Sequence, residues 1–255
     1  MTTTTIAPPS KWLLPLEFRT FGELAAFGAA LPLLTSITPY GDGHPVIVYP
    51  GLGADNLSTV ALRRFLTHRG YAATGWTIGR NYGPRKGVEN GLRQHLCQVS
   101  EEHGQKVSLI GWSLGGIYAR QLAKAMPEAV RSVITLGTPF NGSPRSTNAW
   151  RLYELASGER ADGVVRFLNH PVEGAPLVPT TSIYSRTDGV CAWQVCREDS
   201  AANRESIEVS GSHTGLGHHP AVVFAIADRL SQKEGEWRPF QRSGVRAYFF
   251  PRTER

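Results

Sequence analysis

Short apolar stretches alternate with segments of helical periodicity along most of the chain. A continuous apolar run predicts a buried strand at residues 46–49, and further strands are predicted at residues 72–78, 106–112, 131–136, 180–185 and 206–209. Apolar positions three and four residues apart predict helices at residues 57–69, 90–103, 114–126 and 221–231. Strands that alternate with helices indicate βαβ units, so we expect a mostly parallel central sheet with helices on both faces.

One interval of about forty residues breaks this alternation, between the strands at 131–136 and 180–185. It contains two short helical patterns, at 150–156 and 164–168. A loop of this length inside a compact domain usually serves function. We therefore interpret residues 141–180 as a small cap within a single domain that spans residues 1–255. The apolar side chains of the cap either line an acyl pocket or seat the cap on the sheet; they are Trp150, Leu152, Tyr153, Leu155, Phe167 and Leu168.

The N-terminal region holds the most apolar run, which extends for eleven residues from Leu24 to Leu34 and includes Pro32. A membrane span needs about 20 apolar residues. The run therefore predicts a buried or surface-packed helix, and we expect no stable membrane insertion. Residues 1–10 are polar, and one positive charge, Lys11, precedes the apolar stretch, which is not the pattern of a secretory signal.

Composition excludes several classes of protein. Hydrophobic residues make up 41% of the 255 residues and charged residues 19%, which excludes disordered and coiled-coil chains. Three cysteines are too few for a disulfide scaffold. Cys191 and Cys196 would be able to pair in an exported protein, but three reduced thiols in a cytoplasmic protein is the favoured interpretation.

The net charge of +6 is concentrated near the C-terminus. Half of it lies in residues 233–255, which contain six basic and three acidic residues and several aromatic ones. A basic tail is able to contact nucleic acid or anionic lipid. We favour a solvated tail that packs through its aromatic side chains, and we expect no nucleic-acid partner.

The strongest chemical signal is the sequence Gly-Trp-Ser-Leu-Gly at residues 111–115, which fits Gly-x-Ser-x-Gly. An apolar strand precedes it and a helix follows it, so Ser113 is expected on a sharp turn above the sheet. There its hydroxyl is exposed at the positive end of the helix. The alternative is a serine that only caps the helix.

Acyl transfer by such a serine also needs two backbone N–H donors for the developing oxyanion. One follows the nucleophile, at Leu114. The other is expected in the glycine-rich loop Pro-Gly-Leu-Gly at residues 50–53, at Leu52. The alternative for this loop is an ordinary turn between strand and helix.

An acid and a base follow in the order that this chemistry requires. Asp188 ends an apolar strand at its carboxyl edge, where sites form in open α/β sheets. His213 follows the strand at 206–209 and is placed to reach a serine above the sheet. Asp162 and Asp199 are rival acids, and the histidine pair at 218–219 fits better before the last helix.

The order Ser113, Asp188, His213 and several longer motifs resemble the α/β-hydrolase superfamily, in particular bacterial lipase- and esterase-like proteins of the PGAP1-like group. The motifs are PGLG at 50–53, GWSLGG at 111–116, TLGTPFNGSP at 135–144, YSRTDGV at 184–190 and SHTGLGHHP at 212–220. The resemblance implies an α/β-hydrolase fold with a triad of Ser113, Asp188 and His213. It does not cover residues 1–44 or the tail.

These features predict a serine hydrolase that cleaves carboxylic esters through an acyl-enzyme, with a small-molecule ester as partner and no metal or organic cofactor. Trp112, Arg80 and Asn81 are candidate substrate-binding residues. The alternatives are an acyltransferase with the same triad and a non-catalytic binding protein of this fold. The cap shows no long lid helix, so we expect action on dissolved esters with short or medium acyl chains. The sequence leaves the oligomeric state open.

Overall fold

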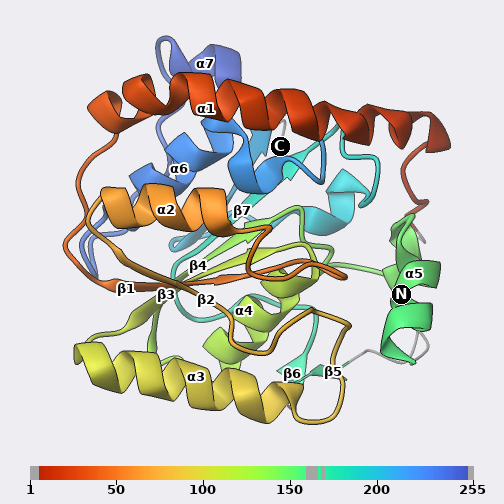
Figure 1. Cartoon of the computed structure of the whole chain (residues 1–255), viewed down its shortest axis with the longest axis horizontal. Helices are drawn as coiled ribbons and strands as arrows, with labels where there is room; N and C mark the ends of the chain where they lie inside the picture. The colour runs from red at the N-terminus through yellow and green to blue at the C-terminus, as the bar shows by residue number, and fades with distance from the viewer. Residues whose placement is uncertain (1–5, 159–165, 168–169, 252–255) are drawn as a thin grey trace.

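A computed structural model describes residues 6–158, 166–167 and 170–251. Its centre is a six-stranded sheet with the order β2-β1-β3-β4-β7-β8, and every neighbouring pair of strands is parallel (Figure 1). The strands are β1 Pro45–Tyr49, β2 Ala72–Gly75, β3 Val107–Trp112, β4 Val130–Leu136, β7 Thr180–Ser185 and β8 Arg204–Val209. The predicted parallel sheet is confirmed.

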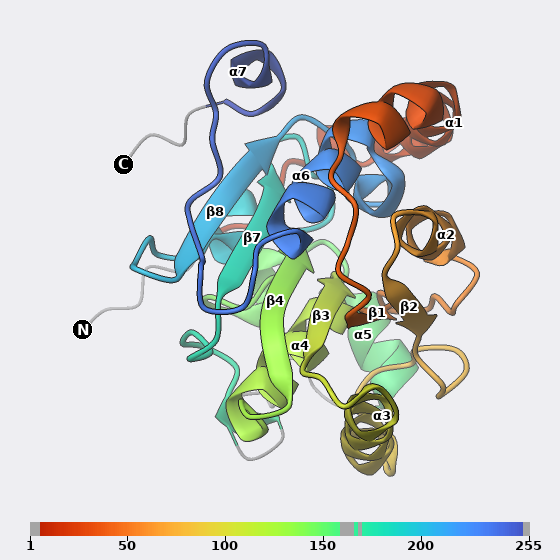
Figure 2. The same ribbon diagram turned by 90° about the vertical axis from the view of Figure 1, so that its left-hand side faces the viewer.

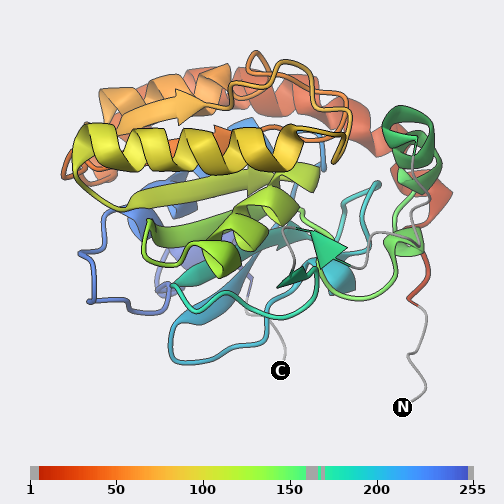
Figure 3. The ribbon, with the colours of Figure 1, turned by 90° about the horizontal axis from the view of Figure 1, so that it is seen from below.

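Helices cover both faces of this sheet, as predicted. One face carries α1 Thr20–Ile37, α2 Val60–His68 and α6 Pro220–Leu230 (Figure 2). The other carries α3 Val88–His103 and α4 Leu114–Ala125 (Figure 3). Side chains alternate between the two cores along each strand: Val46 and Val48 face the first set of helices, whereas Ile47 and Tyr49 face the second. Burial on both faces explains the continuous apolar run of β1.

The N-terminal helical stretch is longer than the sequence predicts. Two 3₁₀ helices, η1 Lys11–Leu13 and η2 Pro15–Arg19, lead into α1. Pro32 lies inside α1. The stretch Lys11–Ile37 spans 27 residues and is long and apolar enough, by length and composition, to cross a membrane. The eleven-residue apolar run is thus part of a longer apolar helical stretch.

Between β4 and β7 lie a 3₁₀ helix at Pro144–Ser146, helix α5 Trp150–Ser157, and a short antiparallel pair of β5 Arg166–Phe167 and β6 His170–Pro171. Helix α5 matches the first helical pattern of the proposed cap. The second pattern, at 164–168, is wrong for residues 166–167, which pair as a strand instead. Leu168 and the rest of that pattern lie outside the described residues. The limits of the cap, 141–180, stay a prediction.

The C-terminal tail packs through two of its aromatic residues. Phe240 and Phe250 are buried against Phe224 of α6, with 4.7 Å between the ring centroids of Phe240 and Phe250. The last helix, α7 Arg246–Phe249, instead leaves Tyr248 and Phe249 exposed.

A buried ion pair fixes α4 to the segment after β7. Arg120 of α4 and Glu198 have side chains that are 1% and 5% exposed, and they are joined by a hydrogen-bonded salt bridge. Arg120 also donates to the Gly174 carbonyl at 2.7 Å and lies 3.6 Å from the centroid of the Phe140 ring. Because α4 begins directly after Ser113, this pair supports the helix behind the candidate nucleophile.

We expect Glu198→Ala to lower the free energy of unfolding by about 3 to 5 kcal/mol, because Arg120 would remain buried without its counter-charge. Urea denaturation followed by circular dichroism measures this loss. Glu236→Ala, at an exposed position, is the control. A loss no larger than that of the control would show that the pair contributes nothing to stability.

Candidate active site

Ser113 occupies a strained turn between β3 and α4. Its φ of 52° makes it the one non-glycine residue with a positive φ in the part of the chain that the structure describes. The flanking glycines permit the turn: a Cβ on Gly111 would lie 2.3 Å from the Gly116 Cα, and one on Gly115 would lie 2.4 Å from the Tyr49 carbonyl oxygen. Strain of this kind collects at functional sites. The turn has the geometry expected of a nucleophile elbow.

The loop after β1 lies against this turn. A Cβ on Gly51 would lie 3.3 Å from the Cβ of Ser113. The strand order reverses between β1 and β3, and the loops that follow two such strands open a crevice at the carboxyl edge of the sheet. Within the described residues, the backbone N–H groups of Leu52 and Leu114 donate no hydrogen bond. Both are therefore available to bind an oxyanion.

Asp188 and His213 form a buried pair. The Nδ1 of His213 lies 2.7 Å from the Oδ2 of Asp188, and their side chains are 6% and 1% exposed. The other carboxylate oxygen accepts from the N–H groups of Val190 and Cys191 at 2.8 and 2.7 Å. Burial lowers the pKa of His213, but the charge of Asp188, the Cys191 thiol and the hydrogen bonds to both together raise that pKa well above its usual value.

Gly137 has no side chain, which leaves room for this pair beside the turn at Ser113. It follows β4 with a φ of +55°, and a Cβ there would lie 3.0 Å from the His213 Nδ1 and 3.2 Å from the Asp188 Oδ2. The neighbouring Leu136 carbonyl accepts from the Ser113 N–H at 2.8 Å. The structure thus brings Ser113, Asp188 and His213 to one edge of the sheet. It shows no hydrogen bond between the Ser113 hydroxyl and His213, which is common before substrate binds.

Trp112 supports the histidine loop. Its indole N–H donates to the His213 carbonyl at 2.9 Å, and its ring lies edge-on to His218 with 6.2 Å between centroids. The side chain belongs to the core and is 9% exposed. The structure therefore gives Trp112 a supporting contact, and its candidate role in substrate binding stays a prediction.

The other two candidate substrate-binding residues have opposite environments. Asn81 is fully buried: its amide donates to the Pro50 carbonyl at 2.8 Å, and its side-chain oxygen accepts from the Tyr118 hydroxyl at 3.0 Å and the Gly83 N–H at 3.1 Å. These bonds use the amide to hold the loop at residues 50–53. The Arg80 side chain is 56% exposed, and its Nη2 lies 3.7 Å from the Oδ2 of Asp55.

We expect Asn81→Ala to lower kcat by about 10- to 100-fold with little change in KM, because the loop that carries Leu52 loses its anchor. The unfolding free energy should fall by about 1 to 3 kcal/mol, since buried polar partners are left unsatisfied. Steady-state kinetics and urea denaturation measure both. Gln98→Ala, which removes an exposed amide on α3, is the control. Equal kinetics for the two variants would contradict the anchoring role.

Two carboxylates of the N-terminal segment also reach the site, and neither was predicted from the sequence. Glu17 accepts from the N–H groups of Gly189, His213 and Thr214 at 2.8, 3.0 and 2.8 Å. Glu23 accepts from the Ser212 N–H at 2.8 Å. Burial raises the pKa of Glu17, but the backbone hydrogen bonds outweigh it and the net pKa is lowered. The available signal was a pair of acidic residues beside a long apolar run.

The rival residues lie elsewhere. Asp199 is exposed, and Asp162 lies outside the described residues. His219 accepts from the Ala221 N–H at the start of α6, and the Nε2 of His218 lies 3.1 Å from the Thr20 hydroxyl. Burial lowers the pKa of both histidines. This histidine pair therefore lies at the beginning of the last helix, where the sequence suggested it.

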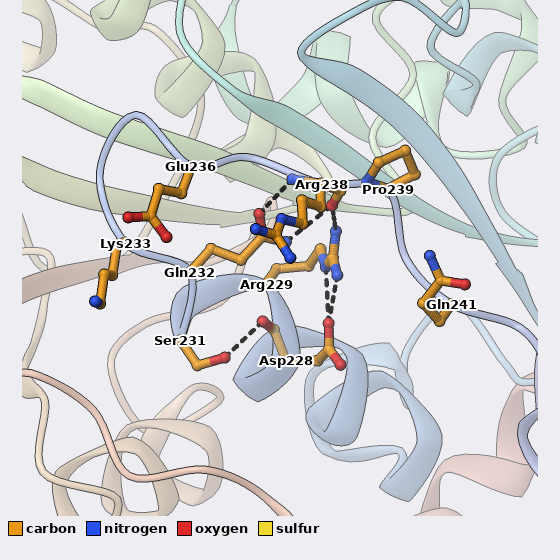
Figure 4. Close-up of a pocket in the computed structure, with 9 residues that line it drawn as sticks. All are labelled: Asp228, Arg229, Ser231, Gln232, Lys233, Glu236, Arg238, Pro239 and Gln241. Atoms are coloured by element: carbon orange, nitrogen blue, oxygen red, sulfur yellow. Dashed lines mark hydrogen bonds and ion pairs between the residues drawn. The ribbon is translucent and has the colours of Figure 1, made fainter.

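No group of His, Cys, Asp and Glu suited to a metal ion occurs among the described residues. A polar hollow does occur at the C-terminal end of α6, opposite the end that carries His219 (Figure 4). Its residues bond to one another: the Arg238 N–H donates to Gln232 at 2.7 Å, and the Gln232 amide donates to the Arg238 carbonyl at 3.0 Å. The hollow is separate from Ser113.

Comparisons with known proteins agree with this geometry. The PGAP1-like alpha/beta domain family matches residues 87–194. A triacylglycerol lipase from Burkholderia plantarii is 34% identical over 126 residues, which are 45% of this chain and 35% of the lipase. A triacylglycerol lipase from Pseudarthrobacter phenanthrenivorans is 36% identical over 110 residues, which are 39% of this chain and 34% of that lipase. The matches thus span about a third of the length of these curated relatives.

The crystal structure of the Bacillus licheniformis lipase BlEst2 in its mature form superposes with a TM-score of 0.53 at 19% sequence identity, over 77% of this chain and 95% of that one. This likeness shows the fold. The chain has the α/β-hydrolase fold, and its predicted resemblance to lipase- and esterase-like members of that superfamily and to the PGAP1-like group is confirmed.

Proposed function

We propose that this protein is a serine hydrolase of carboxylic esters, with Ser113 as nucleophile, His213 as base and Asp188 as the acid that orients the base. The observation that carries the proposal is the Asp188–His213 pair, which is seated on Gly137 beside the strained turn at Ser113. The triacylglycerol lipases among its relatives support the same reaction class.

In the proposed mechanism, Asp188 holds the proton of His213 on Nδ1, which leaves Nε2 to take the proton of the Ser113 hydroxyl. The serine oxygen then attacks the ester carbonyl carbon. The N–H groups of Leu52 and Leu114 bind the resulting oxyanion, which is worth about 3 kcal/mol per donor in comparable sites. The imidazolium returns its proton to the departing alcohol, and neutral His213 next activates the water that releases the acid.

The substrate we propose is a small-molecule ester with a short or medium acyl chain. The described part of the cap supports this, because its helix α5 has only eight residues. We also propose a cytoplasmic site of action. The free thiols of Cys191 and Cys196, which interact with each other in the core, support a reducing compartment.

The test is a series of p-nitrophenyl esters from acetate to palmitate, assayed below and above the solubility limit of each ester. We expect the highest kcat/KM for short and medium chains and no rise in rate above the limit. A jump in rate above the limit with long chains preferred would contradict the substrate proposal. In the same assay, a primary alcohol that yields more ester than free acid would identify an acyltransferase instead.

A further inference from the structure

Helix α1 has apolar residues on both of its faces. Its inner face packs Phe27 and Leu34 onto the core around α6. Glu23, the one charged residue between Thr20 and Ile37 in the sequence, turns inward to Ser212. The exposed face therefore carries no charge, and its large side chains are Phe21, Leu24, Leu33 and Ile37. A helix at the surface of a soluble protein normally presents charged residues outward.

The exposed apolar surface extends from the beginning of α1 into the residues that precede it in the sequence. Trp12, Phe18 and Phe21 are 87%, 74% and 70% exposed, and further exposed large apolar side chains from the same segment adjoin them along the chain. Monomeric soluble proteins rarely expose a contiguous apolar patch of this extent without an interaction partner. The exposed face of the segment Lys11–Ile37 is therefore a candidate interaction surface.

The surrounding charge indicates what covers it. Glu17 and Glu23 both accept from backbone N–H groups of the site, so the charge that remains on the segment is positive: it comes from the exposed Lys11 and from the half-buried Arg19, which donates to the Thr187 carbonyl at 3.0 Å. Figures 1 and 2 place α7 on the same side of the molecule as α1. Helix α7 adds exposed Tyr248 and Phe249, and it begins with Arg246, whose side chain is 41% exposed and lies 3.3 Å from a carboxylate oxygen of Asp228. An apolar surface flanked by positive charge fits an anionic lipid surface.

We propose that the segment Lys11–Ile37, together with α7, docks onto the surface of a bilayer that contains anionic lipid. Helix α1 lies in the plane of the interface, because its inner face stays packed on α6 while its outer face enters the lipid. Exposed aromatic side chains such as Trp12, Phe18 and Tyr248 suit the boundary between headgroups and acyl chains. This docking is independent of the proposed catalytic function.

The experiment is co-sedimentation of the full chain with vesicles of phosphatidylcholine alone or of equal parts phosphatidylcholine and phosphatidylglycerol. We expect binding to the anionic vesicles that weakens as salt is added. The double variant Phe21→Ser with Leu33→Ser should bind at least about tenfold more weakly, since two apolar side chains no longer enter the lipid. Leu177→Ser, which changes an 84% exposed leucine before β7, should bind like wild type.

Circular dichroism confirms that each variant is folded. Two outcomes would overturn the docking proposal. One is the absence of sedimentation with either vesicle. The other is a wild-type dimer in solution that the double variant dissociates, which would show that a second copy of the chain covers this face. Equal binding to both vesicle types would overturn the choice of anionic lipid.

A second inference rests on the hydrogen bonds of Glu17 and on the proposed function. One carboxylate oxygen of Glu17 joins the N–H of Gly189, the residue after Asp188, to the N–H of His213. The other oxygen holds the Thr214 N–H. The carboxylate thus bridges the loop of the acid and the loop of the base. We infer that Glu17 is a positioning residue for the Asp188–His213 pair.

The variant Glu17→Gln tests this positioning role. The amide NH₂ group is a donor, so it is unable to accept from the backbone N–H groups that Glu17 holds. We expect kcat to fall about 10- to 100-fold with KM unchanged. The pH at which kcat/KM declines should not move, because Asp188 and Cys191 rather than Glu17 raise the pKa of His213. Glu236→Gln is the exposed control.

Wild-type kcat in Glu17→Gln would overturn the positioning role. A purely structural role would instead lower the melting temperature and leave kcat per folded molecule intact, which also overturns it. Failure of the proposed function is distinguishable, because Ser113→Ala would then be as active as wild type.

Discussion

Ser113→Ala is expected to abolish ester hydrolysis, with kcat falling about 10⁴- to 10⁶-fold, because the nucleophile and its base act as a unit. The structure supports so large an effect. Ser113 is held at a φ of 52° beside Gly51, and its N–H donates to the Leu136 carbonyl at 2.8 Å. A fluorophosphonate probe should add once per wild-type chain and should not label the variant. Intact-protein mass spectrometry measures the adduct.

The protein provides its own control for this prediction. Ser108, His44 and Asp42 form a second chain of serine, histidine and carboxylate, with 2.9 Å between the Ser108 hydroxyl and the His44 Nε2. Ser108 and His44 are 1% and 0% exposed, so no ester reaches them. Ser108→Ala should therefore still be labelled at Ser113. Labelling that survives in Ser113→Ala would assign the nucleophile to another residue.

The sequence predicted the parts of this fold that depend on local pattern. Strands β1 and β3 are buried along their whole length, so their apolar residues were visible without knowledge of the partners. The turn at Ser113 was visible because sterics require glycine at 111 and 115. Both signals arise within a few neighbouring residues.

Features that depend on distant contacts were not predictable. Glu17 joins Gly189 and His213 across the whole domain, and no spacing in the sequence marks it. Asn81 was predicted to meet substrate because it follows a strand, but its three hydrogen bonds are internal. Likewise, the length of helix α1 was predicted from its apolar run alone. The two 3₁₀ helices that precede α1, and the continuation of α1 through Pro32, became visible only in three dimensions.

Asp188→Asn is expected to lower kcat by up to about 10⁴-fold while the fold is kept. The asparagine oxygen still accepts from the Val190 and Cys191 N–H groups, which turns its NH₂ group toward the Nδ1 of His213. That arrangement favours the tautomer with the proton on Nε2, which is unable to accept the proton of Ser113. Circular dichroism should show the wild-type spectrum.

The residual activity of Asp188→Asn should also shift in pH. Only neutral His213 acts as the base, so in the wild type kcat/KM declines as the pH falls through a pKa raised well above the usual value near 6.5. Removing the Asp188 charge takes away the largest cause that raises the pKa of His213 and leaves Cys191 alone against burial, which lowers that pKa. The decline should therefore move to lower pH in the variant, and a profile of kcat/KM against pH measures it. If the pH at which kcat/KM declines stays the same or rises in Asp188→Asn, Asp188 is not the residue that orients His213. Near-full activity in Asp188→Asn together with an inactive Asp199→Asn would assign that role to Asp199.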